Sequence, residues 1–300
     1  MKNLITRLLG SYLNTLSWLA PRTAARHAFN LFCHPFRTNL RPHHHDFLNT
    51  SEKFNFTHKG ISLQGYKWGN GSRKVLFVHG WQSHTFRWKN YINTLLKKDV
   101  TIYALDAPGH GYSEGRFLSV PLYSDVIEQF ISEQGAMDTV VAHSLGSFAA
   151  VYTLYRVPLL PVNRLVLTAP PGEASDFVDN FRNRLRLSSR TVGLALDYFH
   201  KEFEQPVEYF STKRFAASLV VPGLIVHDKE DDETPFPHAR QIHEVWRKST
   251  LIQTRGLGHN LRSAEVTRIV CDYITSESLP DRETAGALHG EHNISVILPH

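Results

Sequence analysis

Apolar residues at the start of the chain follow the spacing of a helix. Over residues 1–19 they recur every three or four positions, so they fall on one face of an amphipathic helix. The residues of this face are Leu4, Ile5, Leu8, Leu9, Tyr12, Leu13, Leu16 and Leu19. Pro21 ends the predicted helix, and a second short helical run covers residues 22–32. We therefore expect the chain to begin with a helical arm.

From Phe54 onward, short apolar runs alternate with segments of helical spacing. The predicted strands are residues 54–58, 61–68, 75–79, 101–106, 139–143, 165–169, 220–227 and 251–254. The predicted helices are residues 86–98, 123–133, 145–155, 237–246 and 267–274. Continuous apolar strands that alternate with helices are typical of a mostly parallel sheet covered on both faces. The predicted fold class is therefore α/β.

One segment interrupts the alternation. About 50 residues without a strand pattern separate the strand that ends at Ala169 from the strand predicted to begin at Val220. An insertion at the carboxyl edge of a parallel sheet lies where such sheets bind ligands. Helical spacing in this segment predicts a helical cap. We expect its residues Phe177, Phe181 and Tyr198 either to line an acyl pocket or to form the core of the cap.

These patterns divide the chain into four parts. They are a helical arm at residues 1–45, an α/β core at 46–170 and 219–278, the cap at 171–218, and a tail at 279–300. The tail is polar and contains Gly, His and Pro, which predicts a loosely ordered segment. The run of His43, His44 and His45 lies in a linker rich in Pro and Arg, and we expect a solvated loop there.

The net charge of +5 belongs to the arm. Residues 1–45 contain six bases and no acid, which leaves 27 bases against 28 acids in the rest of the chain. Nucleic-acid-binding domains carry bases along a binding surface, so we expect no nucleic-acid partner. Three roles are open for the arm. It covers an apolar patch on its own domain, contacts an anionic membrane through residues 1–20, or is a cleaved signal peptide, although polar residues interrupt the apolar run that a signal needs.

The composition, 42% hydrophobic and 20% charged, is that of a soluble globular protein. No apolar run reaches the roughly 18 residues of a membrane-spanning helix. The two cysteines, Cys33 and Cys271, cannot form a disulfide framework, and no metal-ligand pattern surrounds them. We expect a cytoplasmic protein without a cofactor or metal, whose arm is its candidate for peripheral membrane contact.

The strongest chemical signal is a serine between a predicted buried strand and a helix. Residues 140–147 read VVAHSLGS, with Ser144 at the junction. A nucleophile in such a tight turn needs small neighbours two residues away on either side. Ala142 and Gly146 meet this requirement, although the first position departs from Gly-x-Ser-x-Gly. Serine is also a common N-cap, so this motif alone leaves a structural role open.

Three further motifs follow the same arrangement of strand and loop. Residues 75–81 read VLFVHGW, residues 105–113 read LDAPGHGYS, and the pair of segments 225–236 and 256–260 read IVHDKEDDETPF and GLGHN. In this order the motifs resemble those of the α/β-hydrolase family, over roughly residues 61–275. The resemblance implies an α/β-hydrolase fold and a serine hydrolase of the esterase or lipase type.

The resemblance also implies the catalytic roles. Ser144 is then the nucleophile, His259 the base and Asp231 the acid that orients the base. The backbone N–H groups of Trp81 and Leu145 form the oxyanion hole. Three residues of the motifs are expected to be structural: His79, Asp106 and His110.

Four carboxylates of the acid loop are candidates for the orienting acid, and among them Asp231 matches the family position. Asp228 follows the strand directly and is expected to shape the turn. Asp232 is the nearest rival by a shift of one residue, and Glu230 is expected to be solvated.

The expected activity is hydrolysis of carboxylic esters through an acyl-enzyme. A nucleophilic Asp would have indicated a dehalogenase or an epoxide hydrolase. Two alternatives use the same triad. The first is a thioesterase, a lysophospholipase or a monoacylglycerol-lipase-like enzyme that acts at a membrane face. The second is a perhydrolase or an acyltransferase. A catalytically silent ligand-binding protein on the same scaffold is the alternative of another class.

Overall fold

The computed structural model describes residues 2–276 and 294–299, and it divides the chain into two compact units. The helical unit consists of Met1–His34 and Glu173–Ser211. The sheet unit consists of Pro35–Gly172 and Thr212–His300. Residues 1–34 of the predicted arm and 173–211 of the predicted insertion therefore belong to one unit. Residues 35–45 of the arm and the two ends of the insertion belong to the sheet unit.

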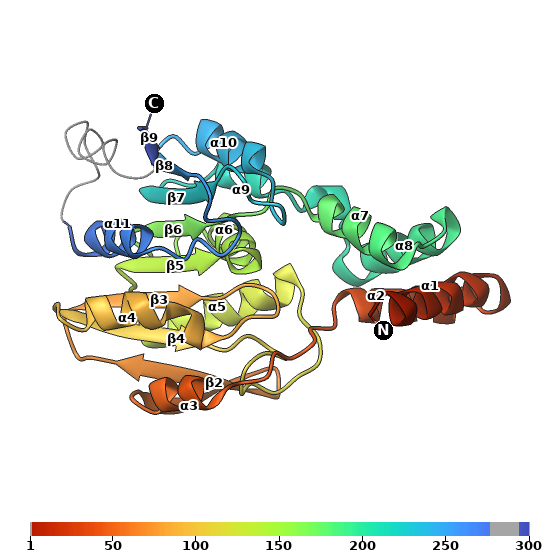
Figure 1. Cartoon of the computed structure of the whole chain (residues 1–300), viewed down its shortest axis with the longest axis horizontal. Helices are drawn as coiled ribbons and strands as arrows, with labels where there is room; N and C mark the ends of the chain where they lie inside the picture. Colours follow the sequence, from red (N-terminus) through yellow and green to blue (C-terminus); the bar gives the residue numbers. More distant parts are fainter. Residues whose placement is uncertain (1, 277–293, 300) are drawn as a thin grey trace. The chain divides into compact units, whose positions relative to one another are not determined.

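The sheet unit is built on a nine-stranded sheet with the order β1-β2-β4-β3-β5-β6-β7-β8-β9 (Figure 1). Its strands are β1 (Glu52–His58), β2 (Ile61–Trp68), β3 (Arg73–Val78), β4 (Val100–Leu105), β5 (Thr139–His143), β6 (Leu165–Thr168), β7 (Gly223–Asp228), β8 (Ser249–Thr254) and β9 (Ser295–Ile297). Strands β3 to β8 run parallel, whereas β1, β2 and β9 pair antiparallel with their neighbours. This arrangement confirms the predicted α/β class.

Helices cover both faces of this sheet. They are α3 (Pro42–Leu48), α4 (Lys89–Leu95), α5 (Val120–Gln134), α6 (Leu145–Arg156), α9 (Thr212–Ala216), α10 (Phe236–Val245) and α11 (Ala264–Thr275), with a 3₁₀ turn η1 (Thr85–Trp88). On one face α4 packs against α11, and on the other α5 packs against α6 (Figure 1). Every residue of β4 to β8 is buried. Burial on both faces explains why most of these strands are rich in apolar residues, although β8 also buries Ser, Thr and Gln side chains.

The helical unit contains α1 (Lys2–Leu19), α2 (Pro21–Phe32), α7 (Ala174–Leu185), α8 (Ser189–Phe203) and a 3₁₀ turn η2 (Val207–Tyr209). Helix α1 packs against α2, α7 and α8, and α2 packs against α8. A small buried cluster joins them, formed by Leu13, Ala28, Leu185 and Leu187. The insertion is helical, as the spacing predicts, and the arm of the same chain is its packing partner.

Two local expectations are wrong. The linker with His43 to His45 is not a solvated loop but lies in α3, because Pro42 begins a helix whose residues Phe47 and Leu48 enter the core of the sheet unit. The tail is not loosely ordered throughout. Its residues 295–297 form β9, where Val296 pairs with Ile252 of β8. The rest of the expected tail up to residue 293, and residue 300, lie outside the described residues.

Candidate active site

Ser144 lies in a strained turn at the carboxyl end of β5. Its backbone has φ 52° and ψ −123°, a combination that residues with a Cβ rarely adopt. The turn has no room for larger neighbours, because a Cβ on Gly146 would lie 2.6 Å from the carbonyl oxygens of Val78 and His79. Helix α6 begins at Leu145, so Ser144 lies in the tight turn between this strand and the helix.

His259 lies on the loop between β8 and α11, next to the Ser144 side chain. Its Nε2 atom is 3.0 Å from Ser144 Oγ, and both residues are 9% exposed. Gly256 and Gly258 have φ values of 84° and 57°, which explains why small residues without a Cβ flank this histidine. The distance is that of a hydrogen bond through which the serine hydroxyl can pass its proton.

Asp231 completes a chain of hydrogen bonds. Its Oδ2 atom is 2.9 Å from Nδ1 of His259. An ionised carboxylate only accepts, so Nδ1 carries the hydrogen and Nε2 is left free to accept from Ser144. Oδ1 of Asp231 accepts the backbone N–H groups of Glu233 and Thr234, both at 2.9 Å. These bonds hold the carboxylate in one orientation towards the ring.

The surroundings of Asp231 keep it ionised. Burial raises the pKa of its carboxyl, but hydrogen bonds from His227, His259 and Thr234 lower it by more, so the pKa lies well below the usual range. Thr234 Oγ1 donates to Asp231 Oδ2 at 2.8 Å. His227 Nε2 donates to Thr234 O at 2.7 Å and lies 3.3 Å from Asp231 Oδ2. No sequence motif predicts these roles for Thr234 and His227. The only feature of the sequence that could have indicated them is that both lie within four residues of Asp231.

The other acids of this loop have different surroundings. Asp228 is buried and shapes the turn, because its carboxylate accepts Thr254 Oγ1 at 2.6 Å and the N–H of Leu257 at 3.0 Å. Asp232 and Glu230 are exposed. The structure thus brings Asp231, and none of these three acids, to hydrogen-bond distance of His259.

The expected oxyanion donors directly follow Ser144 and Gly80 in the chain. Leu145 is the first residue of α6, so its N–H has no partner within the helix. Gly80, which precedes Trp81, passes so close to the serine that a Cβ on it would lie 2.8 Å from Ser144 Cβ. Among the described residues, neither the Trp81 nor the Leu145 N–H takes part in a turn, loop or cap hydrogen bond. Neither amide is therefore held by such a bond, and their role as oxyanion donors stays a prediction.

Buried histidines hold the loops around this turn. His79 accepts the N–H of Ala107 at 2.9 Å, and burial lowers its pKa to about 3. His110 accepts the N–H of Gln82 at 3.0 Å, directly after Trp81, and burial also lowers its pKa to about 3. Both rings stay neutral and fix the loop that carries the Trp81 amide. Asp106 accepts the N–H groups of Thr85 and Tyr112 and the hydroxyl of Tyr66, so it also holds this loop.

The three residues expected to line a substrate pocket lie in the helical unit. Phe181 packs against Phe32 with ring centroids 5.3 Å apart, and Tyr198 packs against Phe29 at 5.1 Å. Phe177 is half-buried on α7. Two of the three therefore contact the N-terminal arm. That the insertion covers Ser144 and lines an acyl pocket stays a prediction.

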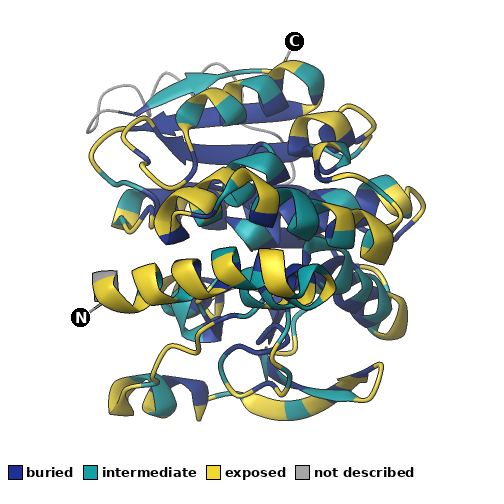
Figure 2. Cartoon of the chain, turned by 90° about the vertical axis from the view of Figure 1, so that its right-hand side faces the viewer, coloured by how far each residue is buried: buried dark blue, intermediate teal, exposed yellow. Residues whose placement is uncertain are grey.

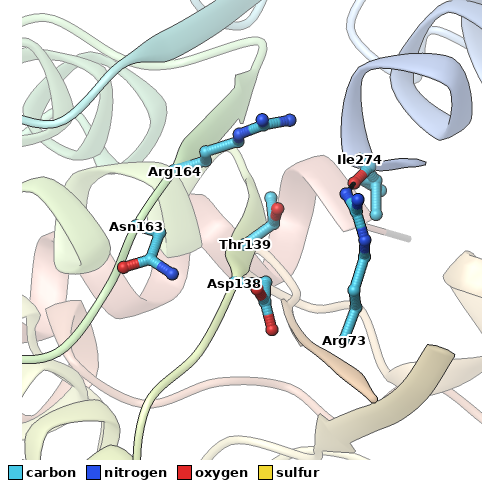
Figure 3. Close-up of a pocket in the computed structure, with 6 residues that line it drawn as sticks. All are labelled: Arg73, Asp138, Thr139, Asn163, Arg164 and Ile274. Atoms are coloured by element: carbon cyan, nitrogen blue, oxygen red, sulfur yellow. Dashed lines mark hydrogen bonds between the residues drawn. The ribbon is translucent and has the colours of Figure 1, made fainter. Parts of the chain in front are cut away.

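The sheet unit also has a cavity of about 340 Å³ at the opposite ends of the strands, where β3, β5 and β6 begin (Figure 3). Arg164 donates to the carbonyl oxygens of Tyr273 and Ser276 at 2.9 and 2.6 Å. Arg73 reaches Ile274 O at 3.5 Å. These guanidinium groups bind the carbonyl groups at the end of α11, which is a structural role. The cavity lies at the amino end of β5, whereas Ser144 follows the carboxyl end of that strand.

Comparison with known proteins identifies the family. The family model described as the alpha/beta hydrolase family matches residues 75–268, more than half of the chain. The chain therefore belongs to the alpha/beta hydrolase family, as the motifs indicate. A serine hydrolase-like protein of Danio rerio is 33% identical over 135 residues, which cover 40% of this chain and 39% of that protein. The chain thus spans about two fifths of this relative.

Solved structures share the fold. The esterase RhEst1 from a Rhodococcus species has a TM-score of 0.57 at 16% identity, over 76% of this chain and 99% of that chain. A thioesterase domain from the curacin biosynthetic pathway has a TM-score of 0.57 at 17% identity, over 75% of this chain and 99% of that chain. At these identities the likeness shows the fold alone. In the part of the chain that the structure describes, no helix combines the length and apolar character needed to cross a membrane.

Proposed function

We propose that this chain is a serine hydrolase that cleaves carboxylic esters through an acyl-enzyme on Ser144. The observation that carries the proposal is the chain of hydrogen bonds from Ser144 Oγ to His259 Nε2 at 3.0 Å and from His259 Nδ1 to Asp231 Oδ2 at 2.9 Å. A nucleophile, a base and an orienting acid are what acyl transfer requires. Membership of the alpha/beta hydrolase family supports the proposal.

In the first half of the reaction, Ser144 Oγ attacks the ester carbonyl carbon and gives its proton to His259 Nε2. The electron pair of the C=O bond moves to the oxygen, which the N–H groups of Trp81 and Leu145 stabilise. Asp231 stabilises the imidazolium without taking its proton. The tetrahedral intermediate then expels the alkoxide, which takes the proton from Nε2 and leaves as the alcohol. Ser144 remains acylated.

In the second half, water replaces the alcohol. It gives a proton to His259 Nε2 as its oxygen attacks the acyl carbon, and the same two amides stabilise the oxyanion. When the intermediate collapses, Ser144 Oγ leaves, takes the proton from Nε2 and returns to its starting state. The products are one alcohol and one carboxylic acid, and the enzyme is unchanged.

The charge near the reacting atoms favours a neutral substrate. Glu233 Oε2 lies 3.8 Å from His259 Nε2, and the Glu233 side chain is 67% exposed. A carboxylate at this position disfavours acyl or alcohol groups that bring a second negative charge close to Ser144. We expect Glu233→Gln to increase kcat/KM for an anionic ester more than for a neutral ester of the same size.

The second candidate function is hydrolysis of thioesters or lysophospholipids at a membrane face, since the same triad serves those leaving groups. The observation in its favour is the basic, amphipathic α1, whose apolar residues are largely exposed. A screen of p-nitrophenyl esters and acyl thioesters from two to sixteen carbons separates these activities. If kcat/KM is higher for the thioester than for the ester at every acyl chain length, the enzyme is a thioesterase and the ester assignment is wrong.

The assignment of Ser144 is tested with a fluorophosphonate, which forms a covalent bond with an activated serine. We expect mass spectrometry to locate the adduct on the peptide that contains Ser144. Ser147, which is buried three residues away, is the matched control. The adduct should persist in Ser147→Ala and disappear in Ser144→Ala. A folded protein that hydrolyses no ester and forms no adduct would instead support a ligand-binding protein on this scaffold.

A further inference from the structure

Helix α1 turns its apolar side chains outward. Leu4 and Leu8 are each 62% exposed, and Trp18 and Leu19 are 72% and 79% exposed. Ile5 and Tyr12 are exposed as well. At 100° per residue these six side chains fall within one arc of the helix, with Ser11 and Thr15 between them. Figure 2 shows α1 exposed along most of its length. We call these six residues the apolar face of α1.

The opposite side of α1 is fixed to the rest of the helical unit. Gly10 lies against the Leu185 carbonyl group, where a Cβ would overlap the oxygen. Asn14 Oδ1 accepts the N–H of Ser188 at 2.8 Å and Thr191 Oγ1 at 2.9 Å. Its Nδ2 donates to Arg186 O at 3.1 Å. These contacts set the rotation of α1 about its own axis, so the apolar face cannot turn inward without breaking them.

Arginines border the apolar face. Arg190 Nε donates to Ser17 O at 3.0 Å, and its guanidinium lies 4.4 Å from the Trp18 ring centre. Arg7 and Arg186 line one shallow hollow beside α1. Residues 1–34 hold four bases and no acid, and residues 180–196 hold four arginines and no acid. The acids of the helical unit all lie at 173–179 and 197–208, outside these two stretches.

We propose that the apolar face of α1 docks onto the surface of an anionic lipid bilayer. An exposed apolar strip bordered by cations is the pattern of helices that lie in the plane of the bilayer interface. Leucine side chains would enter the acyl boundary, Trp18 and Tyr12 would lie at headgroup level, and the arginines would bind lipid phosphates. Because α1 is held on its inner side, docking requires no rearrangement of the helical unit.

A bilayer fits this face better than a second copy of the chain. In a symmetric dimer the same patch is present on both subunits. Pairing through α1 would therefore bring two arginine borders together with no acid on either patch to oppose them. An anionic surface matches both the apolar strip and its charged border. The proposal is independent of the chemistry at Ser144.

Flotation of the full-length protein with lipid vesicles tests this inference. The vesicles are pure phosphatidylcholine, or phosphatidylcholine with one quarter phosphatidylglycerol. The test variant is the double substitution Leu4→Ser and Leu8→Ser, and the matched control is Leu159→Ser, which removes a leucine that is 94% exposed in the sheet unit. All are made in Ser144→Ala as well as in the wild type, so that lipid hydrolysis does not affect the result.

We expect the wild type and Leu159→Ser to float with anionic vesicles and to bind pure phosphatidylcholine several-fold more weakly. Raising the salt concentration should reduce anionic binding, because part of the attraction is electrostatic. The double variant should bind on the order of tenfold or more weakly, since two leucines are lost from the buried side of the interface. Its thermal unfolding should match the wild type, because both side chains are exposed.

Three results would overturn the proposal. They are no flotation of the wild type with anionic vesicles, equal flotation of the double variant, and lipid-free self-association that the double variant abolishes. The last would assign the apolar face to a second copy of the chain. Sedimentation of each protein without lipid is therefore measured beside the flotation.

Discussion

The two units of this chain differ in how far they bury residues with a regular apolar pattern. In the sheet unit, the residues of β4 to β8 are buried without exception. In the helical unit, α1 has an equally regular apolar pattern, but of its eight predicted face residues only Leu13 is fully buried. The side that packs includes Gly10, Asn14 and Ser17 instead. Small and hydrogen-bonding residues fix this helix together with the buried Leu13, and Leu4, Leu8 and Leu19 remain exposed.

This difference shows what periodicity measures. A strand in the middle of a parallel sheet has neighbours on both edges and helices on both faces, so an apolar side chain on it is buried whichever way it points. A terminal helix has only two or three neighbours. Its apolar spacing indicates that an apolar face exists but not what covers it. Close approach at Gly10 and the hydrogen bonds of Asn14 decide the orientation of α1.

The largest effect is expected in the sheet unit, where the polar groups of the site are held by several bonds each. Ser144→Ala should reduce kcat for ester hydrolysis on the order of 10³-fold or more, leaving the catalysis provided by binding and the oxyanion hole. The Tm should hardly change, because only one hydroxyl is removed. Steady-state kinetics with a p-nitrophenyl ester measure the loss. Activity within tenfold of the wild type would place the nucleophile elsewhere.

The next effect separates neighbouring acids within the same loop. Asp231→Asn should reduce kcat about a hundredfold or more, because the carboxamide no longer stabilises the imidazolium or fixes its tautomer. Asp232→Asn removes an exposed carboxylate one residue away and should stay within about tenfold. The two variants are compared at equal folded fraction, measured by circular dichroism. A larger loss in Asp232→Asn than in Asp231→Asn would assign the orienting acid to Asp232.

A pair of helical glycines tests the packing of α1. Gly10→Ala should destabilise the helical unit by about 1–3 kcal/mol, because a Cβ there overlaps the Leu185 carbonyl group. Gly193→Ala in α8 has open space around the added methyl and should stabilise by about 0.5–1 kcal/mol. Urea unfolding of both variants gives the two values. If both substitutions stabilise, α1 does not pack through Gly10.

The smallest effect concerns acid stability. The folded pKa of Asp231 lies below the roughly 3.9 of an unfolded chain, so its contribution to stability is complete above that pH and is lost as the pH falls towards the folded pKa. Between pH 5 and pH 3, the Tm should therefore fall less in Asp231→Asn than in the wild type. Calorimetry at several pH values measures both slopes. Parallel curves would contradict the lowered pKa.

The sequence predicts most of the sheet unit because its signals are local. Each predicted strand and helix of the core has a counterpart, with ends displaced by a few residues. The strand predicted from Val220 begins at Gly223, where the residues just before it include Pro222, which has no N–H to donate. The positions of Ser144, His259 and Asp231 followed from motifs at the ends of strands. The structure brings them together because parallel strands end at one edge.

What the sequence did not predict depends on contacts between distant segments. The pairing of the arm with the insertion joins residues such as Asn14 and Ser188, and no pattern within either segment indicates the other. The helix at Pro42 forms because Phe47 and Leu48 find places in the core of the sheet unit. The roles of Thr234 and His227 required the hydrogen-bond geometry around Asp231. The first two features need partners that lie far away in the sequence, and the third needs side-chain geometry that the sequence pattern does not contain.

Strand β9 has a consequence for the solubility of shortened proteins. It pairs with β8 through Leu251, Ile252 and Gln253, so it covers the backbone N–H and C=O groups on that side of β8. A chain cut before residue 294 would lack β9. The backbone groups on that side of β8 would then form an open sheet edge. Such edges pair with other molecules. Truncation at the C-terminus, intended to leave the catalytic residues untouched, should therefore promote aggregation.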